Sequence, residues 1–411
     1  MDYRPVGKTN LKLSALSYGC MRFGDEESAA AAVKKAIELG VNYFDVAPAY
    51  CGSTSERKLA LGLKGADRGK LVITAKSSPG DGGEGVGQNH RPDIGFGINT
   101  ADQARQEIER SMEIIGVDHL DVYHLWAIHS DRIFDEAMSP GGFLEGVRKA
   151  QSEGLCDYVG MTTHMPADNI IDYCKRFDFD MITLPFHLRD TSRAKAVEYC
   201  AERGIGVIAM NPLAGGALAG PAQALQGIAK SILSPSKDAM TEAPRSPGNS
   251  VAGRASAATP LPSTMTEAAL RFLVGYPGVT TSIVGFTYAS QVEEDVPYAD
   301  KGGLSADEMT ALQSRINELY ANVKHFCTAC GYCGECPEGV LIPEVLEVYS
   351  NLLVPSIAET TMQELLDQLS KDGQGFDPSL CVACGECEAK CPNHLPVSEL
   401  MSAAKDKWPG R

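Results

Sequence analysis

The sequence lacks the features that would place the chain in a membrane or on a nucleic acid. No apolar run approaches the ~18 residues that a membrane span needs, and the opening residues, MDYRPVGKTN, contain no apolar core of a secretory signal. Basic residues are outnumbered, with 37 Lys and Arg against 53 Asp and Glu, which gives a net charge of -16. Nucleic acids and anionic membranes attract clustered Lys and Arg. We therefore expect a cytoplasmic protein that binds neither.

Several short catalytic motifs are also missing. The chain has no P-loop, no nucleophile elbow and no H-E-x-x-H pair. No G-x-G-x-x-G turn follows the first expected strand, which disfavours a doubly wound open sheet. An α/β fold other than the doubly wound open sheet is therefore expected.

Short apolar runs alternate with amphipathic helical stretches along most of the chain. The helical stretches include Glu27–Leu39, Ala101–Ile115, Gly142–Glu153 and Ser192–Arg203. Eight strands with helical crossovers predict an α/β fold of the (β/α)8, or TIM, barrel type. The expected strands are Ala15–Gly19, Tyr43–Val46, Leu71–Ala75, Leu120–Trp126, Tyr158–Thr162, Met181–Leu184, Gly206–Met210 and Thr281–Val284.

The alternation of strand-like and helical stretches, and the point at which it ends, predict the domain organisation. We expect a barrel over residues 1–322, closed by a helix at Asp307–Val323, and a small, mainly helical iron–sulfur domain over 323–411. Residues 234–263, rich in Ser, Pro and Ala, read as a flexible insertion. The Gly-rich stretch Ser78–Gly97 follows the third strand, at the end of the barrel where loops carry function.

Cysteine is the residue whose placement is most informative. Of thirteen cysteines, eight crowd into two runs, CTACGYCGECP and CVACGECEAKCP. The second run has the C-x2-C-x2-C-x3-C-P spacing of bacterial ferredoxins, and the first is one residue shorter before its last Cys. A zinc ion needs only four ligands and has no use for a third Cys in each run. The spacing therefore predicts two [4Fe–4S] clusters.

The ferredoxin pattern also predicts which cysteines share a cluster. In ferredoxin-type pairs, the fourth Cys of each run serves the other cluster. Gly331 and Gly385 are expected to let the two loops turn tightly. The 44 residues between the runs, 337–380, read as helices, for example Pro343–Leu353 and Thr360–Leu369, which resembles helical ferredoxin modules. We expect one cluster on Cys327, Cys330, Cys333 and Cys391, and the other on Cys381, Cys384, Cys387 and Cys336.

Three polar residues near the ends of early strands form a candidate catalytic group. Asp45 and Tyr50 lie in YFDVAPAY, and Lys76 lies in VITAKS. A lysine beside a phenol stabilises the phenolate and so makes the phenol a better proton donor, and a carboxylate keeps that lysine charged.

These residues and their surroundings resemble the aldo-keto reductases over roughly residues 3–300. FDVAPAYCGSTSE resembles the family's F-D-T-A-x-x-Y-G-x-S-E segment. SMEIIGVDHLDVYHLW is similar to the family's S-L-x-x-L-x-x-D-Y-I-D-x-Y-x-x-H helix and strand. YRPVGKTNLKLSALSYGCMRFG, PLAGGAL and PGVTTSIVG match other landmarks in the same order. The resemblance implies that NADP(H) or NAD(H) delivers hydride to a small-molecule carbonyl, while Tyr50 donates the proton with the help of Lys76 and Asp45.

The sequence departs from that family at several positions. Trp126 stands where the family carries its catalytic His, and His124 lies two residues earlier on the same strand face as a candidate replacement. Met210 stands where the family stacks a Tyr on the nicotinamide, and the last phosphate-binding segment, GFTYASQVEED, holds no Lys or Arg. The positions that the resemblance assigns to the nucleotide are Thr162, Thr163, Thr183, Leu213, Gly285, Ser290, Gln291 and Glu294.

Two functions remain open from sequence. The first is an oxidoreductase of the aldo-keto reductase type whose clusters relay single electrons, with a flavin as an alternative mediator and a redox partner protein as a candidate donor. The second is an electron-transfer or regulatory protein whose barrel is a binding scaffold or runs a different redox reaction. A purely structural role for the clusters is a third alternative.

Overall fold

The computed structural model describes residues 1–80, 95–219, 264–331, 333, 336–372 and 375–409. The predicted insertion at 234–263 and most of the Gly-rich stretch after the third strand lie outside these residues. Among the described helices, none combines the length and the apolar character that crossing a membrane would require.

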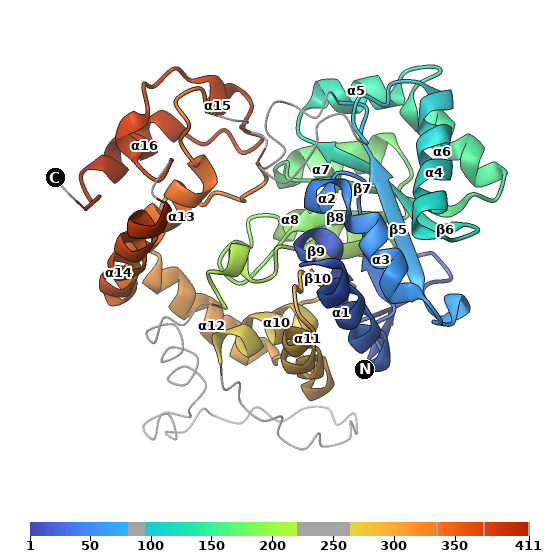
Figure 1. The fold of residues 1–411 in the computed structure, drawn as a ribbon, viewed down its shortest axis with the longest axis horizontal. Helices are drawn as coiled ribbons and strands as arrows, with labels where there is room; N and C mark the ends of the chain where they lie inside the picture. The colour runs from blue at the N-terminus through green and yellow to red at the C-terminus, as the bar shows by residue number, and fades with distance from the viewer. Residues whose placement is uncertain (81–94, 220–263, 332, 334–335, 373–374, 410–411) are drawn as a thin grey trace, which may run out of the picture.

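Eight parallel strands close into a barrel in the order β10-β3-β4-β5-β6-β7-β8-β9, so the predicted (β/α)8 fold is confirmed (Figure 1). All eight expected strands are present, and the structure extends several of them by one to three residues. A short antiparallel hairpin, β1 Tyr3–Pro5 with β2 Lys12–Ser14, precedes the barrel. The barrel strands are β3 Leu16–Gly19, β4 Tyr43–Asp45, β5 Val72–Ser77, β6 Leu120–Ile128, β7 Cys156–Thr163, β8 Met181–Pro185, β9 Gly206–Met210 and β10 Thr281–Val284.

Helices surround the barrel where the amphipathic pattern predicted them. Capping explains where several begin and end: Thr100 forms a capping box with Gln103 at the start of α4, and Gly116 ends that helix with φ of 78°. The helices of the barrel are α1 Glu26–Glu38, α2 Tyr50–Ser53, α3 Ser55–Leu63, α4 Ala101–Ile115, α5 Asp131–Met138, α6 Phe143–Ser152, α7 Ala167–Arg176, α8 Ala194–Glu202, α10 Met265–Gly275, α11 Ala289–Asp295 and α12 Ala306–Leu319.

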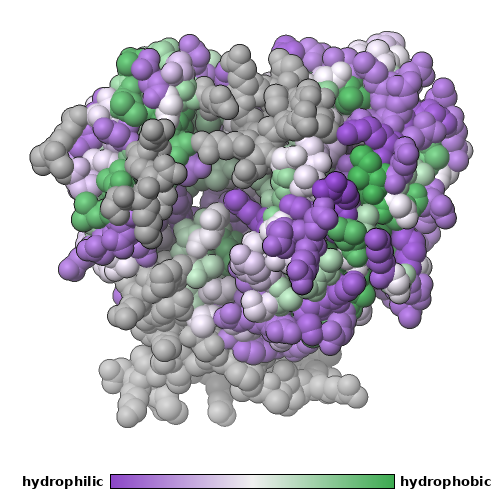
Figure 2. Space-filling model, viewed as in Figure 1, coloured by the Kyte–Doolittle hydropathy of each residue, from purple (hydrophilic) through white to green (hydrophobic). Residues whose placement is uncertain are grey.

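The cysteine region forms a separate helical lobe beside the barrel (Figure 1). Its helices are α13 Ile342–Leu352, α14 Pro355–Asp372, α15 Glu386–Ala389 and α16 Val397–Lys405, which confirms the predicted helices between the two cysteine runs. On the face shown in Figure 2, hydrophilic residues cover most of the outer surface of both parts, and the surface is hollowed between them.

The inside of the barrel is filled in layers. Because side chains alternate along a strand, every second residue of each strand points inward. The layer nearest the N-terminal hairpin is apolar and includes Tyr43, Val72, Val122, Met181 and Ile208. Polar residues stand further along the same strands, toward their carboxyl ends. The barrel interior is therefore polar at the end where the loops after the strands meet.

An ion pair joins the helical lobe to the barrel. Arg189, whose side chain is 2% exposed, donates through two nitrogens to the carboxylate of Glu347 on α13, at 2.7 and 2.9 Å. The guanidinium also lies over the rings of Tyr320 and Phe326, at 5.0 and 4.7 Å from their centroids. Bidentate pairing and ring stacking suit the planar Arg fork, and together they fix the lobe against the barrel.

Candidate functional site

A cavity of about 400 Å³ opens at the carboxyl ends of the barrel strands. Asp45, Tyr50 and Lys76 lie in its wall, together with Trp126, Met210 and residues of the first cysteine run. The three residues predicted to act together are therefore brought to one place by β4, α2 and β5. In TIM barrels, this end of the barrel is where catalytic residues gather.

Asp45 and Lys76 form a buried ion pair. The ammonium of Lys76 donates to Asp45 Oδ1, and both side chains are 2% exposed. Burial alone would lower the pKa of Lys76, but the charges of Asp45 and Tyr50 raise it overall, so the ammonium form persists. The same ammonium lies 4.8 Å from the centroid of the Tyr50 ring. A fixed positive charge thus stands beside the phenol.

Tyr50 is enclosed by aromatic side chains. Its ring meets Trp126 edge to face at 5.5 Å between centroids, and Trp126 in turn packs on Phe96 at 4.4 Å. Burial raises the pKa of the Tyr50 phenol, and Lys76 opposes that shift without overcoming it. Lys76 thus acts on Tyr50 in the expected direction, but the pKa of the phenol stays above its usual value. The low polarity around the ring outweighs the neighbouring charge.

His124 does not reach the cavity. It lies one layer below Trp126 on the same face of β6, is fully buried, and is absent from the cavity wall. A Cβ on Gly160 of β7 would stand 2.4 Å from its ring, so the glycine provides the space that His124 occupies. Burial and the Lys76 charge lower the pKa of His124 to about 3, which keeps the ring neutral. Trp126 is the residue that faces the cavity at this position.

The predicted nucleotide contacts divide into two groups. Thr162 and Thr183 line the cavity, and the buried hydroxyl oxygen of Thr183 has no hydrogen-bond partner among the described residues. Thr163 instead donates to the carbonyl of Ile128 at 2.6 Å and lies behind the wall.

At the other end of the cavity, Leu213, Gly285 and Gln291 are in the wall. Gln291 also accepts hydrogen bonds from the amides of Thr287 and Tyr288 at the start of α11. Ser290 and Glu294 are exposed on α11 and are absent from the wall.

The cavity also contains charged residues that the sequence interpretation missed. Arg22, in the turn after β3, lies in the wall beside Gly285, where a Cβ would stand 2.7 Å from the arginine side chain. Asp295 lies in the wall too, and burial, with a contribution from Glu294, raises its pKa to about 7. Position alone could have indicated Arg22, because loops after barrel strands border the site.

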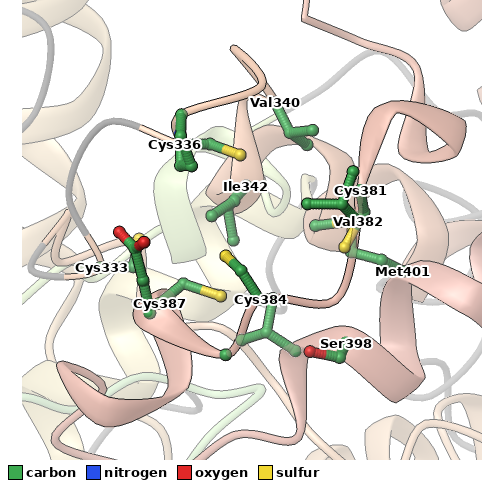
Figure 3. A pocket seen from close by; sticks show the side chains of 14 residues that line it. Cys333, Cys336, Val340, Ile342, Cys381, Val382, Cys384, Cys387, Ser398 and Met401 are labelled. Atoms are coloured by element: carbon green, nitrogen blue, oxygen red, sulfur yellow. The ribbon is translucent and has the colours of Figure 1, made fainter.

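The eight cysteines of the two runs converge within the helical lobe. Figure 3 shows the sulfur atoms of Cys336, Cys381, Cys384 and Cys387 around one pocket, with Cys333 at its side. Cys327 lies near Cys330, Cys333 and Cys391, whose charges all act on its thiol. Cys333 lies between the two groupings, because Cys387 and Cys391 both act on its thiol. None of the eight takes part in a disulfide.

The sulfurs lie further apart than ligands of one bound zinc ion would. Among the described residues, no three cysteine sulfurs lie within 4.8 Å of one another. Four thiolates on one zinc ion, at 2.3 Å each, would bring the sulfurs to about 3.8 Å apart. Burial, with Glu388 and neighbouring sulfurs, raises the pKa of Cys387 to about 11, and burial with neighbouring sulfurs raises that of Cys333 to about 12. Iron would stabilise such crowded thiols as thiolates.

The two cysteine loops share one backbone conformation. Gly331 and Gly385 have φ of 78° and 79°, as expected for tight turns that favour glycine. Ala329 and Ala383, each between the first two cysteines of its run, also have positive φ, at 51° and 56°. Equal strain at equivalent positions indicates two loops built for the same ligand geometry.

Comparisons with known proteins agree with this arrangement. A sequence model of the aldo/keto reductase family matches residues 15–317, and a 4Fe-4S dicluster domain model matches residues 326–395. L-galactose dehydrogenase of Arabidopsis thaliana is 27% identical over 311 residues, which are 72% of this chain and 87% of that protein. L-glyceraldehyde 3-phosphate reductase of Escherichia coli O157:H7 is 25% identical over 351 residues, covering 79% and 94%.

A solved structure shows the same fold. The holo form of an aldo-keto reductase from Bacillus halodurans superposes with a TM-score of 0.57 at 23% identity, covering 76% of this chain and 96% of that one. The barrel, the family model and the related oxidoreductases lead to one conclusion. This chain belongs to the aldo/keto reductase family and is an oxidoreductase of that family with a C-terminal 4Fe-4S dicluster domain.

Proposed function

We propose that the barrel cavity reduces a small-molecule carbonyl, or oxidises the corresponding alcohol, with NADP(H) or NAD(H), and that Tyr50 is the acid. The buried Asp45–Lys76 ion pair beside Tyr50 is the observation that carries this proposal. Structure alone has little need for a buried ion pair, because removing two charges from water costs more than most pairs regain. Because the Asp45–Lys76 ion pair lies in the cavity wall beside Tyr50, it can take part in catalysis there.

The residues of the cavity suit a nicotinamide at one end. Thr183 offers a buried hydroxyl without a partner among the described residues, which can bond a carboxamide. Thr162 and Met210 stand beside it in the wall. When bound there, a reduced nicotinamide supplies a hydride. The cavity is shielded by Trp126 and Phe96, which exclude water from the reacting carbon.

Tyr50 then completes the reduction. Its phenol donates the O–H proton to the carbonyl oxygen, while the carbonyl carbon receives the hydride, so the product is an alcohol. Lys76 stabilises the phenolate that remains, and Asp45 holds the ammonium in place. With Trp126 at the position of the family's His, orientation of the carbonyl rests on Tyr50 and on the shape of the cavity.

Arg22 supports binding of the anionic part of the nucleotide. It stands at the far end of the cavity, near Gly285 and Thr287. The hydroxyl of Thr287 donates to the Arg22 carbonyl at 2.9 Å, which fixes that turn. A guanidinium here can pair with phosphate oxygens that the last segment, without Lys or Arg, cannot bind.

We further propose that the helical lobe carries two [4Fe–4S] clusters and that a redox partner protein exchanges electrons with them. The convergence of four sulfurs at each of two places supports this. A flavin remains the alternative mediator between hydride and single electrons. On this proposal the protein acts in the cytoplasm, where thiols stay reduced.

Anaerobic purification tests these proposals together. Iron, acid-labile sulfide, flavin and nicotinamide are measured per chain, and NADPH or NADH is then mixed with an aromatic aldehyde. We expect about eight irons per chain and consumption of the nicotinamide. Tyr50→Phe should lower kcat by about 10²-fold to 10⁴-fold, because the proton donor is lost.

Tyr199→Phe, on the outer helix α8, is the matched control and should retain wild-type activity. Full iron content without nicotinamide oxidation, or equal activity of Tyr50→Phe and the wild type, would instead support a barrel that is a binding scaffold or runs a different reaction.

A further inference from the structure

The first cysteine run borders the barrel cavity, whereas the second does not. Thr328, Ala329 and Cys330 lie in the wall of the same cavity that Tyr50 and Lys76 line. Cys330 also packs against the apolar cluster that contains Tyr50 and Trp126. No residue of 381–391 lines this cavity; the second run surrounds the separate pocket of Figure 3.

A buried arginine connects the cavity wall to the cysteine loops. Arg193, just before α8, has a side chain that is 2% exposed. Its Nη2 donates to the carbonyl of His164 at 2.6 Å, and His164 is itself in the cavity wall. Its Nε donates to the carbonyl of Met165 at 3.0 Å. The guanidinium is thus fixed behind the loop that follows β7.

The same guanidinium reaches across to the helical lobe. Arg193 Nη2 donates to the side-chain oxygen of Asn393, two residues after Cys391. The amide nitrogen of Asn393 in turn donates to the hydroxyl of Thr328 at 3.4 Å. One chain of hydrogen bonds therefore links the barrel to Asn393, just after the second run, and through it to Thr328 in the first.

The charge of Arg193 acts on the first cluster position. The guanidinium interacts electrostatically with Cys330, and Asp190 is the carboxylate that lies beside it, at 3.4 Å. An arginine stays protonated even when buried. A cluster gains negative charge when it is reduced, so a nearby cation favours the reduced form. Arg189, the other buried arginine at this interface, is instead neutralised by its bidentate pair with Glu347.

We propose that the cluster of Cys327, Cys330, Cys333 and Cys391 is the one that faces the barrel cavity, and that Arg193 is a positioning residue that joins this cluster to the cavity wall and raises its reduction potential. The inference rests on the proposed assignment of eight cysteines to two clusters. The cluster of Cys381, Cys384, Cys387 and Cys336 is then the outer one, on the side available to a redox partner.

A potentiometric titration followed by EPR tests the role of Arg193 in the full-length protein, without any cavity ligand. Arg193→Met should make one of the two clusters about tenfold harder to reduce, which is a fall of 59 mV for a one-electron couple. Arg193→Lys keeps the charge and should restore most of that difference. Arg315→Met, on the exposed face of α12, is the control and should change either equilibrium by less than about twofold, because its charge is exposed and pairs with Glu318.

The two clusters are told apart by ligand substitutions. Cys330→Ser should move the midpoint that Arg193→Met moves, and Cys384→Ser should move the other. Should Arg193→Met fold poorly, Asn393→Ala is the second variant, and it should shift the same midpoint in the same direction by releasing the guanidinium. The inference is overturned if neither midpoint moves, if Lys restores nothing, or if the cluster that moves is the one altered by Cys384→Ser.

A second measurement tests which cluster faces the cavity. NADP⁺ added to the dithionite-reduced protein should change the EPR line shape of the cluster that Cys330→Ser alters and leave the other signal unchanged. A change in the other signal would contradict the inference. If NADP⁺ changes neither signal and is not retained on the protein, the proposal that the cavity binds a nicotinamide fails. The titration of the Arg193 variants still tests whether Arg193 acts on the first cluster.

Discussion

The barrel and the cysteine domain are stabilised by different means. The barrel is a closed ring of parallel strands around an apolar interior, so every strand finds its hydrogen-bond partners inside the fold. The described part of the cysteine domain contains no strand. Its own core is one small cluster, with Val345, Met401 and Trp408 among its buried members and six cysteines packed against them.

That difference predicts how each part depends on metal. A small core seldom suffices for a stable fold without a metal or a disulfide, and here none of the cysteines is in a disulfide. The barrel core needs no such support. We therefore expect the two parts to respond separately to loss of iron, to loss of their contact and to pH.

Removal of iron should have the largest effect. Chelation of the anaerobic protein should unfold α13 to α16 and leave the barrel folded, because iron ligation is the main constraint on the cysteine loops. Circular dichroism and limited proteolysis would measure this, with a stable barrel fragment ending near residue 322 as the expected product. Loss of the barrel together with the lobe would show that the two parts fold as one unit.

Breaking the contact between the two parts should have the next largest effect. Arg189→Met leaves the carboxylate of Glu347 without its partner and removes the stacking on Tyr320 and Phe326. The loss of two charge-assisted hydrogen bonds and of two ring contacts should weaken lobe docking by about 3 kcal/mol, measured as faster hydrogen exchange in α12 and α13. Arg315→Met, on the exposed face of α12, should leave exchange unchanged.

A buried carboxyl in the barrel gives that part its own pH dependence. Burial raises the pKa of Glu56 from 4.5 to about 7. As pH rises between these values, the unfolded chain loses this proton first, so the free energy of unfolding of the barrel falls by up to about 3 kcal/mol. Glu56→Gln should remove that fall, measured by urea denaturation from pH 5 to pH 8. A variant that keeps the slope would show that another group causes it.

The smallest expected effect concerns the cavity. Thr183→Val removes the buried hydroxyl that has no protein partner, so barrel stability should hold or rise slightly while nicotinamide affinity falls by about 1 kcal/mol. Calorimetric titration with NADPH measures this. Ser290→Ala, at the exposed position on α11 outside the cavity wall, is the control. Equal affinities for both variants would place the carboxamide elsewhere.

Sequence by itself determined the parts of this protein that depend on local pattern. The periods of apolar residues predicted all eight strands, and the cysteine spacing predicted the cluster loops, including the positive φ at Gly331 and Gly385. The order of Asp45, Tyr50 and Lys76 at strand ends also predicted that they meet, because parallel strands all end at one face of the barrel.

Only the tertiary structure decided which side chains reach the cavity and what their surroundings do to them. His124 and Trp126 share a strand face, but they lie at different depths within the barrel. His124 is fully buried, whereas Trp126 lies in the cavity wall. The raised pKa of Tyr50 depends on the aromatic enclosure built by distant segments. The approach of Arg193 to the first cysteine run joins residues about 140 positions apart, which no local pattern encodes.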